Sequence, residues 1–175
     1  MSRLLWVLRH AKAVADPPAG QADHDRPLAP RGRRDAAALG ARLAGDGLGF
    51  DRSDLPDLVL CSTALRTRQT VELVLGSSAP PEVDFRRALF YASPEEALAE
   101  VRTVPDDRRS VLLVGHNPTA HALAAELGDD PEGRADIEAR GFPTCSLAVY
   151  RLPSAPWIDT ALGTGQLAGL FTPPY

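Results

Sequence analysis

Residues 4–10 read Leu-Leu-Trp-Val-Leu-Arg-His, five apolar side chains followed at once by a cation and an imidazole. The apolar run is continuous and lacks the three- and four-residue gaps of an amphipathic helix, which is typical of a β-strand buried on both faces. The stretch therefore predicts a buried strand whose end presents Arg9 and His10.

Similar apolar runs recur along the chain and alternate with helical patterns. Further strands are predicted at 58–61, 111–114 and 146–152, and helices at 31–45, from after Thr63 to about Leu75, from Ser93 to before Pro105, and at 119–127. The glycine-broken tail 157–174 predicts a weak strand at a sheet edge, and the polar segment 129–140 predicts an exposed insertion. Strands that alternate with helices predict an α/β layered sheet.

The bulk composition limits the class of protein. A chain of 175 residues buries one substantial core, so we expect a single domain over 1–175. The net charge of -4 argues against a general affinity for nucleic acid, and no segment is long and apolar enough to span a bilayer. Cys61 and Cys145 are isolated thiols, which predicts reduced core residues in a cytoplasmic protein rather than a disulfide or a metal site.

Polar residues gather where three of the predicted strands end. The first strand ends in Arg9 and His10, the second leads into Ser62 and Arg66, and the third is followed by His116. In an α/β sheet, ligands bind beyond the carboxyl ends of the strands. We therefore expect these side chains to surround one phosphoryl group.

Each member of this set has a chemical task. The forked guanidinium groups of Arg9 and Arg66 match phosphate oxygens and stay charged. A neutral His10 is a competent nucleophile towards phosphorus and forms a phosphoramidate. We expect His116 to be protonated beside the anion and to stabilise charge on the equatorial oxygens in the transition state.

Three neighbouring polar residues have simpler interpretations. Lys12 lies two residues after His10 and is a candidate for a second contact to phosphate. Ser62 is predicted, with Thr63, to cap the following helix, whose first amide groups would also face the phosphate. His24 lies among aspartates in a polar loop and is expected to be solvated.

Four segments resemble those of a known family. Residues 8–12 resemble the "RHG" signature of the histidine phosphatase, or phosphoglycerate mutase-like, superfamily in its "RHAK" variant. Residues 25–28 with 31–32 resemble the "RPL…G" stretch of its short SixA-type members, residues 61–70 its "SxxxRxxQT" segment, and residues 114–118 its second-histidine motif. In this order the resemblance covers nearly the whole chain.

The resemblance implies a fold and a mechanism. It implies a three-layer α/β/α sandwich with a mixed, mostly parallel central sheet. It further implies a phosphohistidine intermediate at His10, a phosphate pocket formed by Arg9, Arg66 and His116, and no metal or other cofactor.

One family feature is missing from the sequence. Many members carry a glutamate that protonates an oxygen leaving group, but residues 84–93 hold none in the expected place, and Asp84, Glu95 and Glu96 are weak substitutes. Transfer of a phosphoryl group from one imidazole to another depends less on a proton donor than does expulsion of an alkoxide. The short phosphohistidine phosphatases share this absence, which favours a phosphohistidine protein as substrate.

Other functions remain as alternatives. A phosphatase of small phosphorylated metabolites is the second candidate. A phosphoglycerate mutase is disfavoured by the missing glutamate and the short chain. A phosphate-binding regulatory module without catalysis would belong to another class, and intact Arg9, His10, Arg66 and His116 argue against it.

Overall fold

Six strands form one mixed sheet within the residues that the computed structural model describes, which are 3–45, 47–76 and 81–175. The strands are β1 (Arg3–Arg9), β2 (Leu58–Ser62), β3 (Glu82–Arg86), β4 (Ser110–Gly115), β5 (Leu147–Leu152) and β6 (Gln166–Phe171). Their order is β3-β2-β4-β1-β5-β6. β1, β2, β3 and β4 pair in parallel, whereas β5 runs antiparallel to both β1 and β6. The expected mixed, mostly parallel sheet is confirmed.

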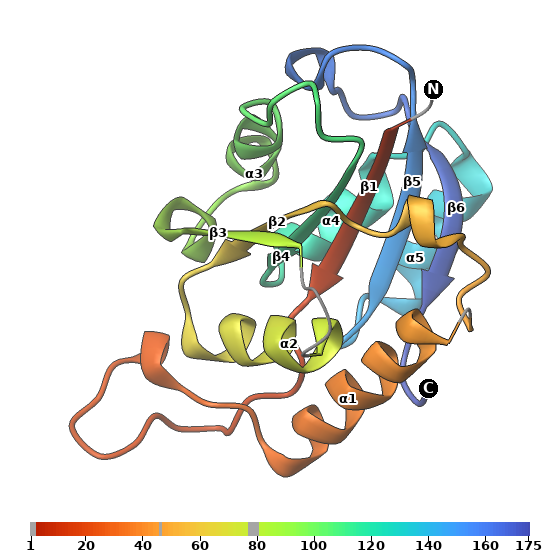
Figure 1. Cartoon of the computed structure of the whole chain (residues 1–175). Helices are drawn as coiled ribbons and strands as arrows, with labels where there is room; N and C mark the ends of the chain where they lie inside the picture. Colours follow the sequence, from red (N-terminus) through yellow and green to blue (C-terminus); the bar gives the residue numbers. More distant parts are fainter. Residues whose placement is uncertain (1–2, 46, 77–80) are drawn as a thin grey trace.

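Helices cover both faces of the sheet (Figure 1). Alternate residues of β1 belong to different cores: Leu4, Trp6 and Leu8 to one and Leu5 and Val7 to the other. The first core includes residues of α1 (Pro30–Ala44) and α2 (Leu65–Leu75), and the second those of α3 (Pro94–Val101), α4 (Thr119–Glu126) and α5 (Pro131–Arg140). The three-layer α/β/α arrangement is therefore confirmed.

Two elements differ from the sequence prediction. The predicted insertion at 129–140 contains the helix α5, which Asp130 caps by accepting from the amides of Glu132 and Gly133. It packs through Ile137, so a single buried side chain anchors an otherwise polar helix. The edge strand β3 was not predicted, because its side chains are half-buried or exposed and form no apolar run.

The start of α2 also differs. Its N-cap is Ala64, and among the described residues no side chain caps it. Ser62 is instead the last residue of β2, so the predicted cap formed by Ser62 and Thr63 is wrong.

The strand order places three strand ends beside one another. β1 pairs with β4 so that Arg9 lies opposite Gly115, and β2 pairs with β4 so that Cys61 lies opposite Val114. The backbone amide of His10 donates to the Gly115 carbonyl at 3.0 Å. The residues that follow β1, β2 and β4 therefore meet at one edge of the sheet.

Two further expectations concern bulk properties. Cys61 and Cys145, which both lie in the described ranges, are free and buried, and burial raises the pKa of each thiol to about 12.

Within the same ranges, no helix has the length and apolar character needed to cross a bilayer.

Candidate active site

His10 lies at the end of β1 with its ring oriented by the backbone. Its Nδ1 is 2.8 Å from the carbonyl oxygen of Ala11. Because a carbonyl oxygen only accepts, Nδ1 carries the proton and Nε2 keeps a lone pair. Burial lowers the pKa of His10 to about 4; the hydrogen bond to Ala11 opposes this shift, and the charges of Arg66, Arg9 and Arg26 add to it. His10 is therefore neutral near pH 7, the form in which an imidazole attacks phosphorus.

His116 follows β4 and lies next to His10. The two ring centroids are 5.1 Å apart, and His116 Nε2 is 2.8 Å from the hydroxyl of Ser62. Burial, followed by the charges of His10 and Arg66, lowers the pKa of His116 to about 3, against an opposing effect of Asp23. His116 is therefore neutral near pH 7 in this structure, and its protonation beside a phosphate dianion, which the negative charge would favour, stays a prediction.

Two arginines flank the histidines. Arg9 donates from Nη1 to the Phe142 carbonyl at 2.7 Å, and Arg66 donates from Nη1 to the Asp23 carbonyl at 2.8 Å. Burial lowers the pKa of both guanidinium groups, but an arginine stays charged in a protein. The Nε atoms of Arg9 and Arg66 and Nδ1 of His116 are buried and have no hydrogen-bond partner among the described residues. Buried donors of this kind are normally satisfied, and phosphate oxygens would satisfy them here.

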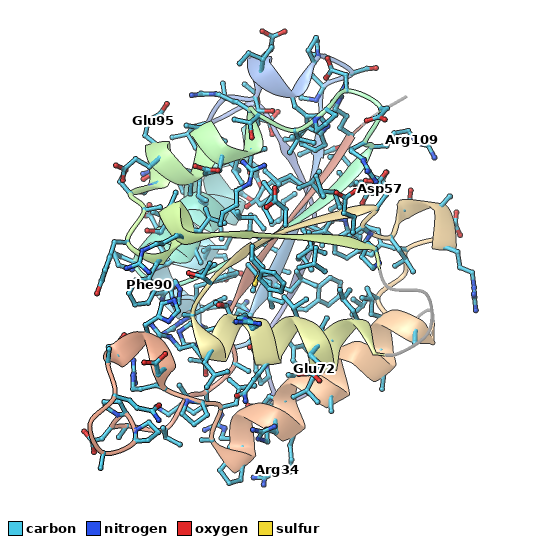
Figure 2. All side chains as sticks on the ribbon, turned by 60° about the vertical axis from the view of Figure 1, so that its left-hand side comes forward. Arg34, Asp57, Glu72, Phe90, Glu95 and Arg109 are labelled. Atoms are coloured by element: carbon cyan, nitrogen blue, oxygen red, sulfur yellow. The ribbon has the colours of Figure 1, made fainter. Side chains whose placement is uncertain are left out.

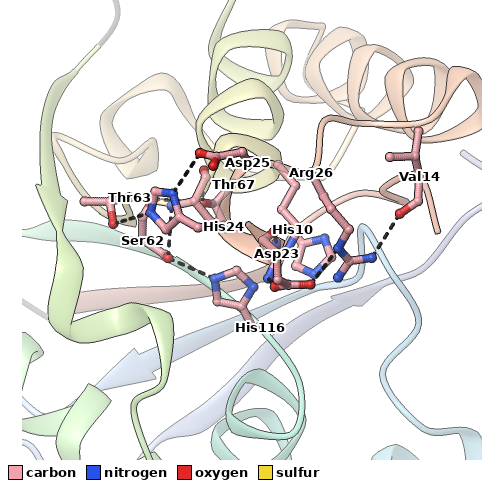
Figure 3. Close-up of polar contacts among 12 residues, drawn as sticks. His10, Val14, Asp23, His24, Asp25, Arg26, Ser62, Thr63, Thr67 and His116 are labelled. Atoms are coloured by element: carbon pink, nitrogen blue, oxygen red, sulfur yellow. Dashed lines mark hydrogen bonds and ion pairs between the residues drawn. The ribbon is translucent and has the colours of Figure 1, made fainter. Parts of the chain in front are cut away.

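Asp23 and Arg26 also belong to the site, although neither was predicted as a site residue. The Asp23 carboxylate pairs with Arg66 at 3.1 Å and with Nε of Arg26 at 2.7 Å, and Arg26 donates from Nη1 to the Val14 carbonyl at 2.9 Å (Figure 3). Partial burial acts to raise the pKa of Asp23, but the two arginines outweigh it and lower the pKa. Asp23 is therefore ionised and joins two cations beside His10. The mixed charges at 23–26 were the signal available in the sequence.

His24 and Phe90 also belong to the site. His24 Nε2 is 2.9 Å from Thr63 Oγ1, and its ring packs edge-on against Phe90 at 5.0 Å. Phe90, which Figure 2 labels, also contacts the ring of His116 at 5.4 Å and lies under the Arg66 guanidinium at 5.4 Å. The expectation that His24 is simply solvated is wrong, because its side chain is only 29% exposed. Phe90 forms a wall, as its aromatic character favours.

The carboxylates considered as proton donors are engaged elsewhere. Asp84 pairs with Arg86 at 2.8 Å, and Glu95, which projects from α3 in Figure 2, pairs with Arg102 at 2.7 Å. Glu96 accepts from the N-cap amide of its own helix at 2.7 Å. These contacts give none of the three a role at the histidines.

Ser62 and Lys12 are placed differently. Ser62 is fully buried, and its hydroxyl bonds to His116, so that it joins β2 to the histidine after β4. Lys12 is exposed, and its carbonyl accepts from the Ala29 amide at 2.8 Å. A contact between the Lys12 side chain and phosphate stays a prediction.

Comparisons with known proteins find relatives in sequence and in structure. A sequence profile of the histidine phosphatase superfamily (branch 1) matches residues 5–89, which include His10 and Arg66. An uncharacterised protein of Mycobacterium tuberculosis is 40% identical over 171 residues, covering 95% of this chain and 99% of the relative.

Two solved structures are similar over almost their whole length. One, assigned as the phosphohistidine phosphatase SixA of Nakamurella multipartitia, has a TM-score of 0.83 and 36% identity and covers 100% of this chain and 98% of that one. The other, assigned as SixA of Agrobacterium tumefaciens, has a TM-score of 0.77 and 31% identity, with 99% of each chain covered. The similarity therefore includes every strand that contributes to the site.

Proposed function

The chain belongs to the histidine phosphatase superfamily and is a phosphatase of the SixA type, and we propose that it hydrolyses phosphohistidine in proteins through a phosphorylated His10. The observation that carries the mechanism is the state of His10: its Nδ1 is bonded to Ala11, its Nε2 is unprotonated, and three arginines act on it. A neutral nucleophile among fixed cations suits attack on an anionic phosphoryl group.

The reaction has two steps. Nε2 of His10 attacks phosphorus while the bond between phosphorus and the leaving group breaks, and Arg9 and Arg66 hold the phosphoryl oxygens throughout. Water then attacks phosphorus, the bond to His10 breaks, and phosphate departs. His116, beside His10, donates a hydrogen bond to the transferring group, and fixed donors of this kind cost no reorganisation during the reaction.

The surroundings of the leaving group support the choice of substrate. The glutamate that protonates an oxygen leaving group in many relatives is missing from residues 84–93, and Asp84, Glu95 and Glu96 are engaged in other contacts. A leaving imidazole depends less on a proton donor than an alkoxide does, because its proton affinity resembles that of the attacking imidazole. The names given to the two SixA structures point the same way. The free, buried thiols suit a reducing compartment, and we propose the cytoplasm as the location.

Trapping the intermediate tests the mechanism. A protein phosphorylated on histidine by phosphoramidate is mixed with the enzyme, the reaction is quenched in alkali, and acid-labile phosphate is located by mass spectrometry. We expect label on His10 and loss of both label and activity in His10→Ala. The control is His121→Ala, whose ring bonds to the Ile137 carbonyl at 3.2 Å and should not matter for activity. Activity retained in His10→Ala would contradict the mechanism.

A substrate profile tests the substrate class. The value of kcat/KM for the phosphohistidine protein should exceed those for sugar phosphates, nucleotides and phosphoserine. Faster turnover of the small esters would show that metabolites are the substrates, and the phosphorylated His10 would still stand.

A further inference from the structure

Two histidines from different loops hydrogen-bond to consecutive residues at the end of β2. Nε2 of His116 lies 2.8 Å from Ser62 Oγ, and Nε2 of His24 lies 2.9 Å from Thr63 Oγ1. Both rings also pack edge-on against Phe90, at centroid distances of 5.4 and 5.0 Å. His24 therefore belongs to the same assembly as His116, although it comes from the loop after β1 (Figure 3).

The loop that carries His24 is fastened to α2. Arg66 donates to the Asp23 carbonyl at 2.8 Å and pairs with the Asp23 carboxylate at 3.1 Å. On the other side of the ring, Nδ1 of His24 lies 3.5 Å from Asp25 Oδ1. With 29% of its side chain exposed, His24 is held in place and still reaches water.

The leaving group needs a proton, and the two buried histidines have other tasks in the reaction. When phosphorus moves to His10, an electron pair stays on the departing atom, which leaves more easily if the leaving group is protonated. His10 is the nucleophile, and His116, whose Nε2 lies 2.8 Å from Ser62 Oγ, directs its other ring nitrogen to the transferring group. Asp23 is held ionised by its arginines, and the other candidate carboxylates are engaged outside the site. Among the described histidines of this assembly, His24 is the one without another task in the reaction.

We propose that His24 donates a proton to the leaving group and then takes one from the attacking water, a role that rests on the phosphatase reaction proposed above. In the first step, the bond between phosphorus and the leaving atom breaks and its electron pair stays on the leaving group. The proton of the His24 imidazolium moves to that group. In an ester it goes to the bridging oxygen, and in phosphohistidine to the ring nitrogen that does not carry phosphorus.

The second step restores both histidines. A water oxygen attacks the phosphorus of phosphorylated His10, and neutral His24 accepts one of the water protons. The electron pair of the breaking P–N bond returns to Nε2 of His10, and phosphate is released. One water is consumed, and His10 and His24 regain their starting forms.

The charged groups around His24 come from three elements. Asp23 and Asp25 flank it on its own loop, and Asp25 Oδ1 lies 3.5 Å from its Nδ1. Arg66 on α2 pairs with Asp23 at 3.1 Å, and His116, after β4, is neutral near pH 7 in this structure. An imidazole is the side chain that most readily gives and takes a proton near neutral pH, so this position suits an acid in one step and a base in the next.

Leaving-group dependence tests the proposal. In His24→Gln, kcat/KM for phenyl phosphate, whose leaving group needs a proton, should fall by about 100-fold or more. The value for p-nitrophenyl phosphate, whose leaving group departs without one, should fall far less. The matched control is His121→Gln on α4, which should change neither value.

Chemical rescue separates proton transfer from folding. Imidazole added to His24→Ala should restore part of the activity towards phenyl phosphate, because a free imidazole can replace the missing ring. Equal losses on the two esters without rescue would overturn the role of His24, while a phosphorylated His10 would still be detected. If the wild-type enzyme forms no phosphorylated His10 with any donor, the proposed function itself fails.

Discussion

Protonation of His10 and His116 is coupled to the stability of the folded protein. Burial lowers the pKa of His10 from 6.5 to about 4 and that of His116 to about 3. As the pH falls below 6.5, the unfolded chain binds protons at these rings before the folded protein does. The stability contributed by the two neutral rings is therefore fully present above about pH 6.5, and it is lost as the pH falls towards their folded pKa values.

Replacement of His10 should make stability less sensitive to acid. A pKa shift of this size corresponds to a loss on the order of 3 kcal/mol between neutral pH and about pH 4. In His10→Gln, the free energy of unfolding should lack this part of its decrease with falling pH. Urea unfolding at a series of pH values measures the difference. His121→Gln should follow the wild-type curve. Parallel curves for wild type and His10→Gln would show that burial does not perturb His10.

Replacement of Arg66 should remove binding of the phosphoryl group. Arg66→Lys keeps a positive charge but loses the fork, and kcat/KM should fall by about 100- to 1,000-fold, the range for loss of one transition-state donor. Vanadate, which resembles the transition state, should bind correspondingly more weakly in a competition assay. Arg68→Lys, two residues further along α2 at an exposed position over Phe85, is the control. Unchanged vanadate affinity in Arg66→Lys would place the pocket elsewhere.

The sequence predicts the residues at strand ends better than those in the loops. The spatial meeting of His10, Ser62 and His116 follows from parallel strands whose carboxyl ends share an edge. The contact between His24 and Thr63 spans 39 residues and depends on how an irregular loop returns to α2, which no periodic pattern encodes. Local charges alone made His24 look solvated.

At the scale of elements, α1 packs directly on the loop that follows the nucleophile. A Cβ built on Gly32 would lie 2.1 Å from the carbonyl oxygen of Lys12, closer than any real contact. The same carbonyl accepts from the Ala29 amide. The backbone after His10 is thus held against the first turn of α1, which tolerates no side chain there.

Alanine at position 32 should therefore destabilise the protein. In a free helix, Gly→Ala stabilises by roughly 1 kcal/mol, whereas here the clash should cost roughly 1–3 kcal/mol and displace the loop after His10. Thermal unfolding and kcat/KM measure the two effects. The comparison variant is Ala37→Gly, at an exposed site of the same helix, which should lose stability without losing activity. A more stable Gly32→Ala enzyme would contradict the close packing.

Elements with a strong apolar signal are predicted and those without one are not. The runs in β1, β2 and β4 reflect burial on both faces, which is where side-chain type and structure are most tightly linked. β3 lies at the edge beside β2 alone, so its side chains meet solvent. α5 has one buried residue and therefore no amphipathic stripe to detect.

At the scale of the whole molecule, the core should protect both cysteines. Cys61 and Cys145 have no exposed surface, and burial raises the pKa of each thiol to about 12. The thiolate is the reactive form, so the folded protein should resist iodoacetamide near neutral pH, and both thiols should react in urea. Mass spectrometry counts the modified cysteines. Rapid modification without denaturant would mean that this core opens readily.

The adjacency of β1 and β4 has a consequence for how this enzyme can diverge. His10 and His116 extend neighbouring strands, and the 5.1 Å between their rings is close to the 4.7–4.9 Å that hydrogen bonding imposes on any two paired strands. The backbone hydrogen bonds between β1 and β4 therefore keep the two reacting histidines at a fixed spacing. His24 and Phe90 lie outside the paired strands, so we expect substitutions of these two residues to change which leaving group is accepted without changing the distance between the two imidazole rings.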